Sequence, residues 1–392
     1  MARGLLLEAL LVLLGARVGV AFTFATLGDW GGATLGGFHK DNALAVSKQL
    51  GESAAANDVK FIINTGDNFY YCGTLNVTDE QFKTDFEDVY TAESLSVPWY
   101  GVLGNHDYAY DVESQLKYRS PKNDRWQMPA RYFSRRVLLG GSSYATLIFI
   151  DTNPCVQAYL DTDPKHWDPC SGEYGAECQV DGKCYFHEHV VSQDCKAQFD
   201  WFKSTLAAVD EDDWVIVVGH HPAQEIDVED FAGAMLASGR VRLYLNGHAH
   251  ELRHYRLDDE SGADFVTSGA GCMVETLDQE AAAAGFVNGA TTVFKNRVSG
   301  FTLHEFAEDF SSLTTTYLDG NGAVVHTFTT AKTGGSPGPG PAPPAPAQTV
   351  CEDDGCGYKP GRSCQCNARC KHYGDCCDDY AEICGNSIGL VI

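Results

Sequence analysis

Apolar runs that end in a short, glycine-led polar loop recur along this chain and limit the folds it can adopt. Five of these loops carry side chains able to bind cations; they read GDW, GDNFY, GNHD, GHHP and GHAH and begin at residues 28, 66, 104, 219 and 247. Each follows a run with the apolar content of a buried strand. In α/β sheets the carboxyl ends of such strands collect at one edge, where ligands bind. The sequence therefore predicts an α/β protein whose polar loops meet at one site.

The rest of the pattern supports this fold class. Two further strand-like runs, ATLIFIDTN and DFVTSGAG, begin at residues 145 and 264. Amphipathic patterns over 78–90 and 194–208 predict helices, and the alternation of strand, loop and helix is typical of α/β proteins. Residues 299–330 change to short runs separated by Gly, Asn and Asp, which predict an antiparallel meander that closes the domain.

Composition divides the chain into four parts. Residues 1–21 hold a leucine-rich stretch too short to cross a bilayer and end in small residues, as a secretory signal peptide does. Residues 22–331 form the main domain. Residues 332–349 are a Pro/Gly-rich linker without large apolar side chains. Residues 350–385 carry eight cysteines in a segment too small to be stable by apolar burial, which predicts a disulfide-rich module.

The cysteines and a glycosylation sequon indicate the compartment in which this protein works. The chain has 15 cysteines and a glycosylation sequon at Asn76-Val77-Thr78, both of which fit an oxidising, glycosylating route. We expect a secreted, extracellular protein, or one in a lysosome- or vacuole-like compartment. Glu8 and Arg17 interrupt the first apolar run, so we expect no stable membrane anchor.

The net charge of −25 would repel nucleic acid, which excludes it as a partner. An anionic substrate must therefore be held by local positive charge, such as metal ions. The loops offer mixed oxygen and nitrogen ligands, which suit Fe, Mn or Zn. Taken singly, Asp29 could cap a helix and Asn105 could make a turn. Five such loops together favour two metal ions, which can clamp a phosphoryl group and lower the pKa of a bound water.

Over residues 24–330 the chain resembles the purple acid phosphatases, most closely the small tartrate-resistant type of the metallophosphoesterase superfamily. The resemblance rests on the five loops, on the stretches FEDVY, VPWY and LGNHD, on SGAG at 268–271 and on the final meander. It implies a four-layer α/β (α+β) sandwich in which two packed mixed β-sheets are flanked by helices. It also implies hydrolysis of phosphate monoesters by in-line attack of a metal-bound hydroxide.

The resemblance further implies a binuclear centre of Fe(III) and a divalent metal, which is Fe, Zn or Mn. Its implied ligands are Asp29, Asp67, Tyr70, Asn105, His220, His248 and His250. Asp29, Tyr70 and His250 would hold the Fe(III), and Asp67 would bridge the two ions. Asn105, His220 and His248 would complete the second site. The phenolate of Tyr70 would give the centre its colour.

His106 is the catalytic candidate, placed to hydrogen-bond the phosphate or to protonate the leaving group; the alternative is a role in orienting Asn105. Relatives often have a further active-site histidine at the position of Glu229. Either Glu229 or His221 could take its place near the substrate, so the identity of the general acid stays open.

A cysteine-rich segment at 153–196 replaces a shorter loop of the mammalian relatives. It could shape specificity or cover the site, or it could be a surface insertion. Together with Cys72 and Cys272, the main domain holds seven cysteines, so at least one has no partner within it. A pair between Cys72 and Cys272 is a hypothesis only.

The pattern of residues 351–384, with CQC, CC and DY at their spacings, resembles a somatomedin B domain. Such modules are knotted by four disulfides and commonly bind proteins, which implies an extracellular protein partner; the alternative is an inert spacer. The leading interpretation is a secreted, binuclear metal acid phosphatase. The alternatives are a phosphodiesterase or nucleotidase on the same metal centre, and a matrix- or adhesion-binding protein that acts through the C-terminal module.

Overall fold

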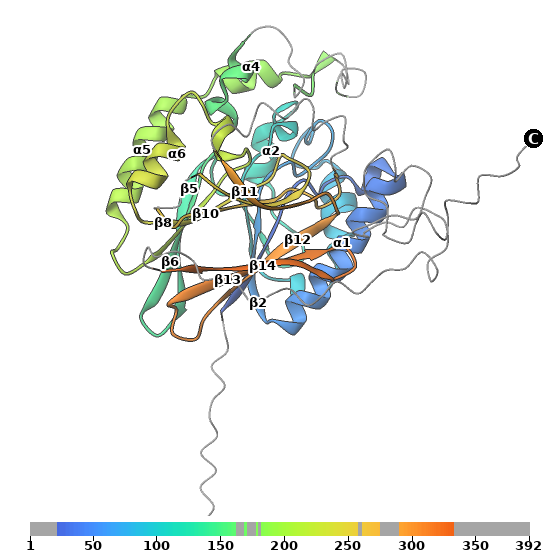
Figure 1. Ribbon diagram of the computed structural model, residues 1–392. Coiled ribbons are helices and arrows are strands. Elements are labelled where there is room, and N and C mark those ends of the chain that lie inside the picture. Colours follow the sequence, from blue (N-terminus) through green and yellow to red (C-terminus); the bar gives the residue numbers. More distant parts are fainter. Residues whose placement is uncertain are drawn as a thin grey trace, which may run out of the picture.

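The computed structural model describes residues 22–161, 168–170, 178, 182–257, 261–274 and 290–332. The expected signal peptide, linker and C-terminal module lie outside these residues, so their boundaries stay predictions. Within the described part, two seven-stranded mixed sheets pack together with helices on both sides (Figure 1). The predicted four-layer fold is confirmed.

The first sheet has the strand order β14-β13-β12-β1-β2-β3-β4. Its strands, in chain order, are β1 (Thr23–Leu27), β2 (Val59–Asn64), β3 (Trp99–Gly101), β4 (Trp126–Gln127), β12 (Gly300–Phe306), β13 (Ser312–Asp319) and β14 (Val324–Ala331). Strands β1 to β4 run parallel, while β12, β13 and β14 pair antiparallel and join the sheet at β1. These last three strands are the predicted meander.

The second sheet has the order β11-β9-β10-β8-β7-β6-β5. Its strands are β5 (Phe133–Gly140), β6 (Ser143–Phe149), β7 (Trp214–Val218), β8 (Val241–Asn246), β9 (Leu252–Arg256), β10 (Asp264–Ser268) and β11 (Thr291–Asn296). Strands β6, β7, β8 and β10 are parallel. The carboxyl ends of the parallel strands therefore form one edge in each sheet, as the polar loops require.

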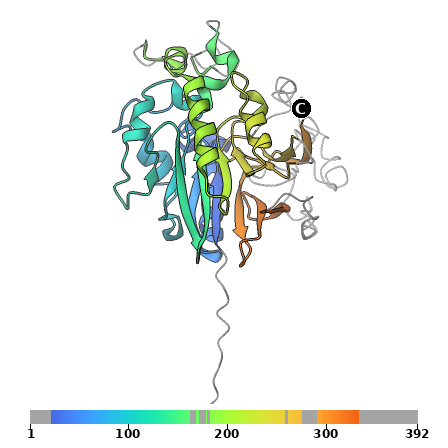
Figure 2. The same ribbon diagram turned by 90° about the vertical axis from the view of Figure 1, so that its left-hand side faces the viewer.

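Helices cover the outer faces of both sheets (Figures 1 and 2). The α-helices are α1 (Gly37–Ala56), α2 (Val112–Lys117), α3 (Gln157–Leu160), α4 (Phe186–Val191), α5 (Cys195–Ala208) and α6 (Phe231–Ala237). Short 3₁₀ segments are η1 (Ala33–Leu35), η3 (Glu93–Leu95), η4 (His106–Tyr108), η5 (Asn153–Cys155) and η7 (Ala223–Glu225). Helix α1 packs on the first sheet, and α5 and α6 pack on the second.

The helix predicted over 194–208 is confirmed as α5. The pattern over 78–90 gives only a six-residue π-helix, η2 (Phe82–Glu87). Its widened turn appears in the amide of Asp88, which donates to the carbonyl of Lys83 five residues earlier. The Asp85 side chain is held on the neighbouring loop, where it accepts from the amide and hydroxyl of Thr34. This tertiary contact competes with a regular α-helix.

The continuous apolar runs follow from burial of both sheet faces. In β2, Ile63 faces the core between the sheets while Ile62 faces the α1 layer. In β7, Val218 faces the inter-sheet core and Val217 faces the α5 layer. Strands buried on both faces lose the apolar–polar alternation of a half-exposed strand.

Three disulfides join the described cysteines: Cys72–Cys178, Cys155–Cys195 and Cys170–Cys184. Cys272 is buried and free, so the hypothesis of a Cys72–Cys272 pair is wrong. Cys272 lies beneath the loop of Asp29, where its amide donates to the Asp29 carbonyl. Cys72 instead packs outward with Cys178 of the inserted segment. The expectation that one of the seven cysteines has no partner is confirmed.

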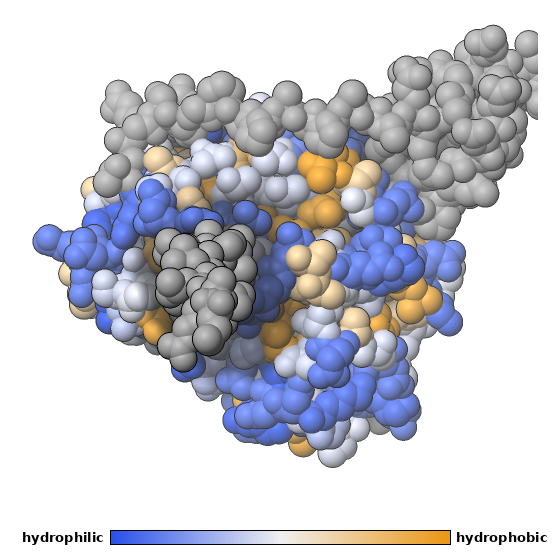
Figure 3. Space-filling view, turned by 90° about the horizontal axis from the view of Figure 1, so that it is seen from below, coloured by the Kyte–Doolittle hydropathy of each residue, from blue (hydrophilic) through white to orange (hydrophobic). Residues whose placement is uncertain are grey.

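The face seen from below in Figure 3 is hydrophilic over most of its described surface, with scattered hydrophobic side chains. Among the described residues, no helix has the length and apolar character needed to cross a bilayer.

One buried histidine makes the fold sensitive to acid. His304 in β12 is fully buried and stacks on Phe24, with their ring centroids 4.5 Å apart. Its Nε2 lies 3.0 Å from the hydroxyls of Thr26 and Thr302, and its Nδ1 lies 3.0 Å from that of Thr315. Burial lowers the pKa of His304 to about 3.

We therefore expect acid to weaken the fold through His304. The unfolded chain takes up this proton below about pH 6.5, whereas the folded chain does not, so stability falls as the pH falls. The free energy of unfolding should drop by about 2 kcal/mol more between pH 7 and pH 5 in the native chain than in His304→Gln. Denaturant titrations across this pH range, with a chelator present, measure the difference. Equal pH slopes would contradict this account.

Candidate metal centre

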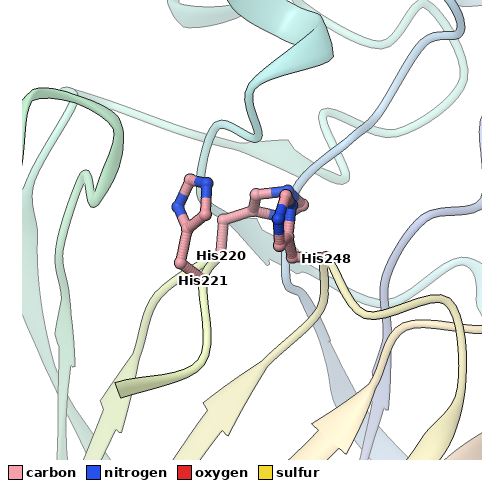
Figure 4. Close-up of side chains that lie close together, drawn as sticks. All are labelled: His220, His221 and His248. Atoms are coloured by element: carbon pink, nitrogen blue, oxygen red, sulfur yellow. The ribbon is translucent and has the colours of Figure 1, made fainter. Parts of the chain in front are cut away.

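The five polar loops meet at one end of the molecule, where both sheets present the carboxyl ends of their parallel strands. The loops after β1, β2 and β3 belong to the first sheet, and those after β7 and β8 belong to the second. Three of the histidines that converge there, His220, His221 and His248, come from the two loops of the second sheet (Figure 4). The structure thus brings together side chains that lie far apart in the sequence.

A first group of donors surrounds the phenol of Tyr70. Its Oη donates to Asp29 Oδ1 and lies equally close, at 3.0 Å, to Asp67 Oδ2. His250 Nε2 lies 3.1 Å from the same Oη and 3.4 Å from Asp29 Oδ1. Tyr70 is 3% exposed, so its side chain shields this group of donors from bulk water.

A second group surrounds the amide oxygen of Asn105. Asn105 Oδ1 lies 3.1 Å from His220 Nε2 and 3.1 Å from His248 Nδ1. Asp67 connects the two groups, because its Oδ1 lies 3.5 Å from His220 Nε2 while its Oδ2 faces Tyr70. The other six predicted ligand residues therefore lie around Asp67.

The histidines are oriented by acceptors outside the cluster. His220 Nδ1 lies 2.8 Å from the Thr65 carbonyl, and His106 Nδ1 lies 2.6 Å from the Tyr71 carbonyl. Each ring thus uses one nitrogen to fix its position and turns the other inward. His106 Nε2 is 4.0 Å from the Asp67 carboxylate.

The backbone around the cluster is strained and tightly packed. Asp29, Asp67, His248 and His250 have positive φ angles of 55°, 50°, 68° and 26°. Such conformations are rare outside glycine and concentrate at functional sites. At Gly104 a Cβ atom would lie 2.1 Å from Asp67 Oδ1, so only glycine lets the two loops come this close.

The charges of the cluster depend on one another. Burial alone would raise the pKa of Asp67, but the imidazoles of His220 and His106 hold that pKa well below its ordinary value. Burial alone would lower the pKa of His220, but Asp67 raises it to about 9. Burial and the nearby carboxylates, first that of Asp29, hold the pKa of the Tyr70 phenol well above its ordinary value.

The donor set fits a metal centre. Donor atoms of Asp29, Asp67 and His220 all lie within 4.8 Å of one another. Two buried carboxylates in one place need positive compensation, which cations supply. Carboxylate, phenol, amide and imidazole donors together suit Fe, Mn or Zn.

Residues 22–252 match the sequence model of the calcineurin-like phosphoesterases. The chain belongs to this family. Tartrate-resistant acid phosphatase type 5 of Oryctolagus cuniculus is 31% identical over 317 residues, which cover 76% of this chain and 87% of that protein. The human protein of the same name is 32% identical over 284 residues, or 69% and 79% of the two chains. Purple acid phosphatase 3 of Arabidopsis thaliana is 33% identical over 256 residues, or 64% and 63%. The expected relationship to the purple acid phosphatases is confirmed.

Solved structures agree on the fold of this phosphoesterase. The purple acid phosphatase PPD1 from yellow lupin superposes with a TM-score of 0.50 at 15% identity, covering 80% of this chain and 54% of that one. GAP50, described as the anchor in the inner membrane complex of Plasmodium, gives 0.58 at 22% identity, covering 80% and 89%. Residues 349–387 match the somatomedin B domain, as expected.

His221 borders the phosphoesterase centre without facing it freely. Its Nδ1 lies 2.7 Å from the Thr152 hydroxyl, and its Nε2 lies 2.9 Å from the Tyr159 hydroxyl. Its nitrogens are close enough to those of His220 and His248 to share a cation with them. We nevertheless interpret His221 as a wall residue, because both of its ring nitrogens face hydroxyls outside the two donor groups, whereas His220 and His248 each turn one nitrogen to Asn105 Oδ1.

Glu229, the other substrate-binding candidate, is half-buried beyond η7, where its charge acts on Lys196 of α5. A different carboxylate reaches the centre: Glu225 Oε2 lies 3.3 Å from His248 Nε2. Sequence analysis missed Glu225. The available signal was its position. Glu225 comes three residues after Pro222, which follows the histidine pair, and a short turn there returns the chain toward the metal centre.

The inserted segment packs against the same region. Its residue Tyr159 contacts His221, and Cys178 ties the segment to Cys72, two residues after Tyr70. Helix α4 of the segment lies beside η4, the 3₁₀ segment whose first residue is His106. This arrangement favours a role next to the site over a surface decoration, and an influence on specificity stays a prediction.

Proposed function

We propose that this phosphoesterase is a secreted, binuclear metal-dependent acid phosphatase that hydrolyses phosphate monoesters. The observation that supports it most is the convergence of six residues with oxygen or nitrogen donors around the buried Asp67 carboxylate. The names of the relatives, tartrate-resistant and purple acid phosphatases, support the same reaction.

Two metal sites follow from the two donor groups. Asp29, Tyr70 and His250 would hold Fe(III), and Asp67 would bridge the two ions. The second site, for a divalent Fe, Zn or Mn, would use Asn105, His220 and His248. When bound, the two cations would supply the positive charge that the acidic chain lacks and would lower the pKa of a water molecule, so that it could lose a proton and serve as a hydroxide nucleophile.

His106 would assist the departure of the ester oxygen. Its Nδ1 donates to the Tyr71 carbonyl, so the neutral ring has its lone pair on Nε2. Only the protonated ring can donate from Nε2 to a phosphate or leaving-group oxygen. Burial lowers the pKa of His106, so the donating form is favoured by acid.

The cellular setting is part of the proposal. Residues 1–21 would direct secretion, and the three disulfides of the main domain are typical of an oxidising compartment. Residues 332–349 would connect the phosphoesterase domain, residues 22–331, to the somatomedin B domain near residues 350–385. That module would bind an extracellular protein.

The test is made on the full-length chain purified from culture medium. We expect two metal ions per chain, visible absorption, and faster hydrolysis of p-nitrophenyl phosphate than of bis(p-nitrophenyl) phosphate at acidic pH. A colourless, metal-loaded chain without monoesterase activity would contradict the proposal. Faster turnover of the diester would assign the phosphodiesterase alternative.

Replacing His106 separates catalysis from metal binding. In His106→Gln we expect kcat at acidic pH to fall by roughly 100-fold or more, because the side chain can no longer give up a proton. Metal content should stay at the level of the native chain. Loss of metal with the loss of rate would instead make His106 a ligand or a residue that orients one.

The two adjacent tyrosines provide a matched pair. Tyr70 Oη lies among the proposed iron ligands, whereas Tyr71 contacts His106 through its carbonyl and ring. The iron-loaded Tyr70→Phe variant should lose the visible absorption, because the phenolate is its source, and Tyr71→Phe should keep it. A visible spectrum of each variant at equal iron content decides the assignment, and the reverse result would exchange the two roles.

A further inference from the structure

Glu225 is a buried carboxylate that the proposed reaction does not yet use. It ends η7, the short turn that follows β7, and is 8% exposed. Its amide donates to the Pro222 carbonyl, which closes the turn and directs the residue back toward the cluster. A buried carboxylate is costly without a donor or cation beside it. The group that faces it is His248, whose Nε2 lies 3.3 Å from Glu225 Oε2.

The opposite nitrogen of the same ring faces the second donor group. His248 Nδ1 lies 3.1 Å from Asn105 Oδ1, and His220 Nε2 lies 3.1 Å from that oxygen too. A histidine that binds a metal is neutral and carries one N–H. A carboxylate is a stronger acceptor than an amide oxygen, so the contact with Glu225 places this N–H on Nε2. The Nδ1 lone pair then points into the cluster.

We propose that Glu225 is a positioning residue that fixes the orientation and tautomer of His248 for the second, divalent ion; this inference rests on the proposed function. His220 and His106 are oriented by neutral backbone carbonyls, those of Thr65 and Tyr71. Glu225 differs from these acceptors by its charge. A charged acceptor makes the opposite nitrogen a stronger donor to a cation as well as holding the ring in place.

The surroundings of Glu225 strengthen this contact. The buried side chains of Tyr159, Tyr244 and Tyr255 lie close enough for its charge to act on them. Where water is excluded, an ionic hydrogen bond is stronger than at the surface. His248 also has a φ of 68°, so its loop is held in a conformation that its own backbone does not favour. A contact to the His248 ring from another element, such as that of Glu225, helps to hold the loop in this conformation.

The experiment measures zinc affinity on the full, iron-loaded chain. Zn²⁺ is titrated against a competing chelator in the native chain, Glu225→Ala and Glu225→Gln. We expect Glu225→Ala to bind Zn²⁺ about 10- to 100-fold more weakly. Glu225→Gln should recover part of the loss, because its amide oxygen still accepts the Nε2 proton without carrying charge. The visible absorption of the iron site should be unchanged in both.

The matched control is Glu211→Ala, which removes an exposed carboxylate before the other end of β7 and should bind Zn²⁺ as the native chain does. Native zinc affinity in a folded Glu225→Ala would overturn the proposal, as would an equal loss of the iron absorption, since Glu225 would then support the whole centre. If Glu225→Ala does not fold, Glu225→Gln with native affinity would overturn it. A native chain that binds no second ion would contradict the proposed function itself, which distinguishes the two failures.

Discussion

The buried carboxylate of Asp67 is the contact on which the rest of the site depends. One oxygen faces the Tyr70 phenol and the other faces the His220 ring, while the amide of His106 also donates to it. A movement of the donors around Tyr70 would therefore also affect the donors around Asn105, because Asp67 connects the two groups. The surroundings are built to keep this carboxylate in place, since Asp67 has a positive φ and Gly104 packs too closely for any side chain. A carboxylate proposed to bridge two cations needs this rigidity, because both cations would share it.

The two sheets contribute different chemistry to the site. The first sheet supplies oxygen donors, through Asp29, Asp67, Tyr70 and Asn105, and the second supplies the imidazoles of His220, His248 and His250. The spacing between these two sets is fixed by the apolar core between the sheets, where residues such as Ile63 and Val218 meet. A cation bound to both sets would therefore cross-link the sheets. Metal affinity and fold stability are then linked, because ions that bind only the folded chain stabilise it by mass action.

The fold and most of the site could be predicted because their signals are local. A buried strand, its terminal glycine and the polar residues after it stand within about ten positions, which is enough to find Asp29, Asp67 and His220. Features that depend on distant contacts could not be predicted. Cys72 pairs with Cys178 across 106 positions, and Glu225 reaches His248 only because a turn after β7 returns the chain. The π-helix η2 also depends on a distant contact, since the side chain of its residue Asp85 is held by Thr34 of η1.

Acid places opposing demands on this molecule. In the proposed mechanism, protonation of His106 would favour donation to a leaving group, and because burial lowers the pKa of this ring, the donating form would need acid. Low pH also disfavours the folded state, because the unfolded chain takes up a proton at His304 that the ring buried in the apolar sheet does not. Protons would also compete with cations for His220 and His248, which would weaken the proposed centre under the same conditions. Three features act against this loss. The pKa of Asp67 is held well below its ordinary value, the proposed role of Glu225 beside His248 would favour the cation, and each disulfide limits the entropy of the unfolded chain. A metal centre that works in acid thus needs buried acceptors and imidazole rings that are held by residues outside the centre. Both properties follow from the packing of the two sheets, because their polar loops converge at one end of the molecule.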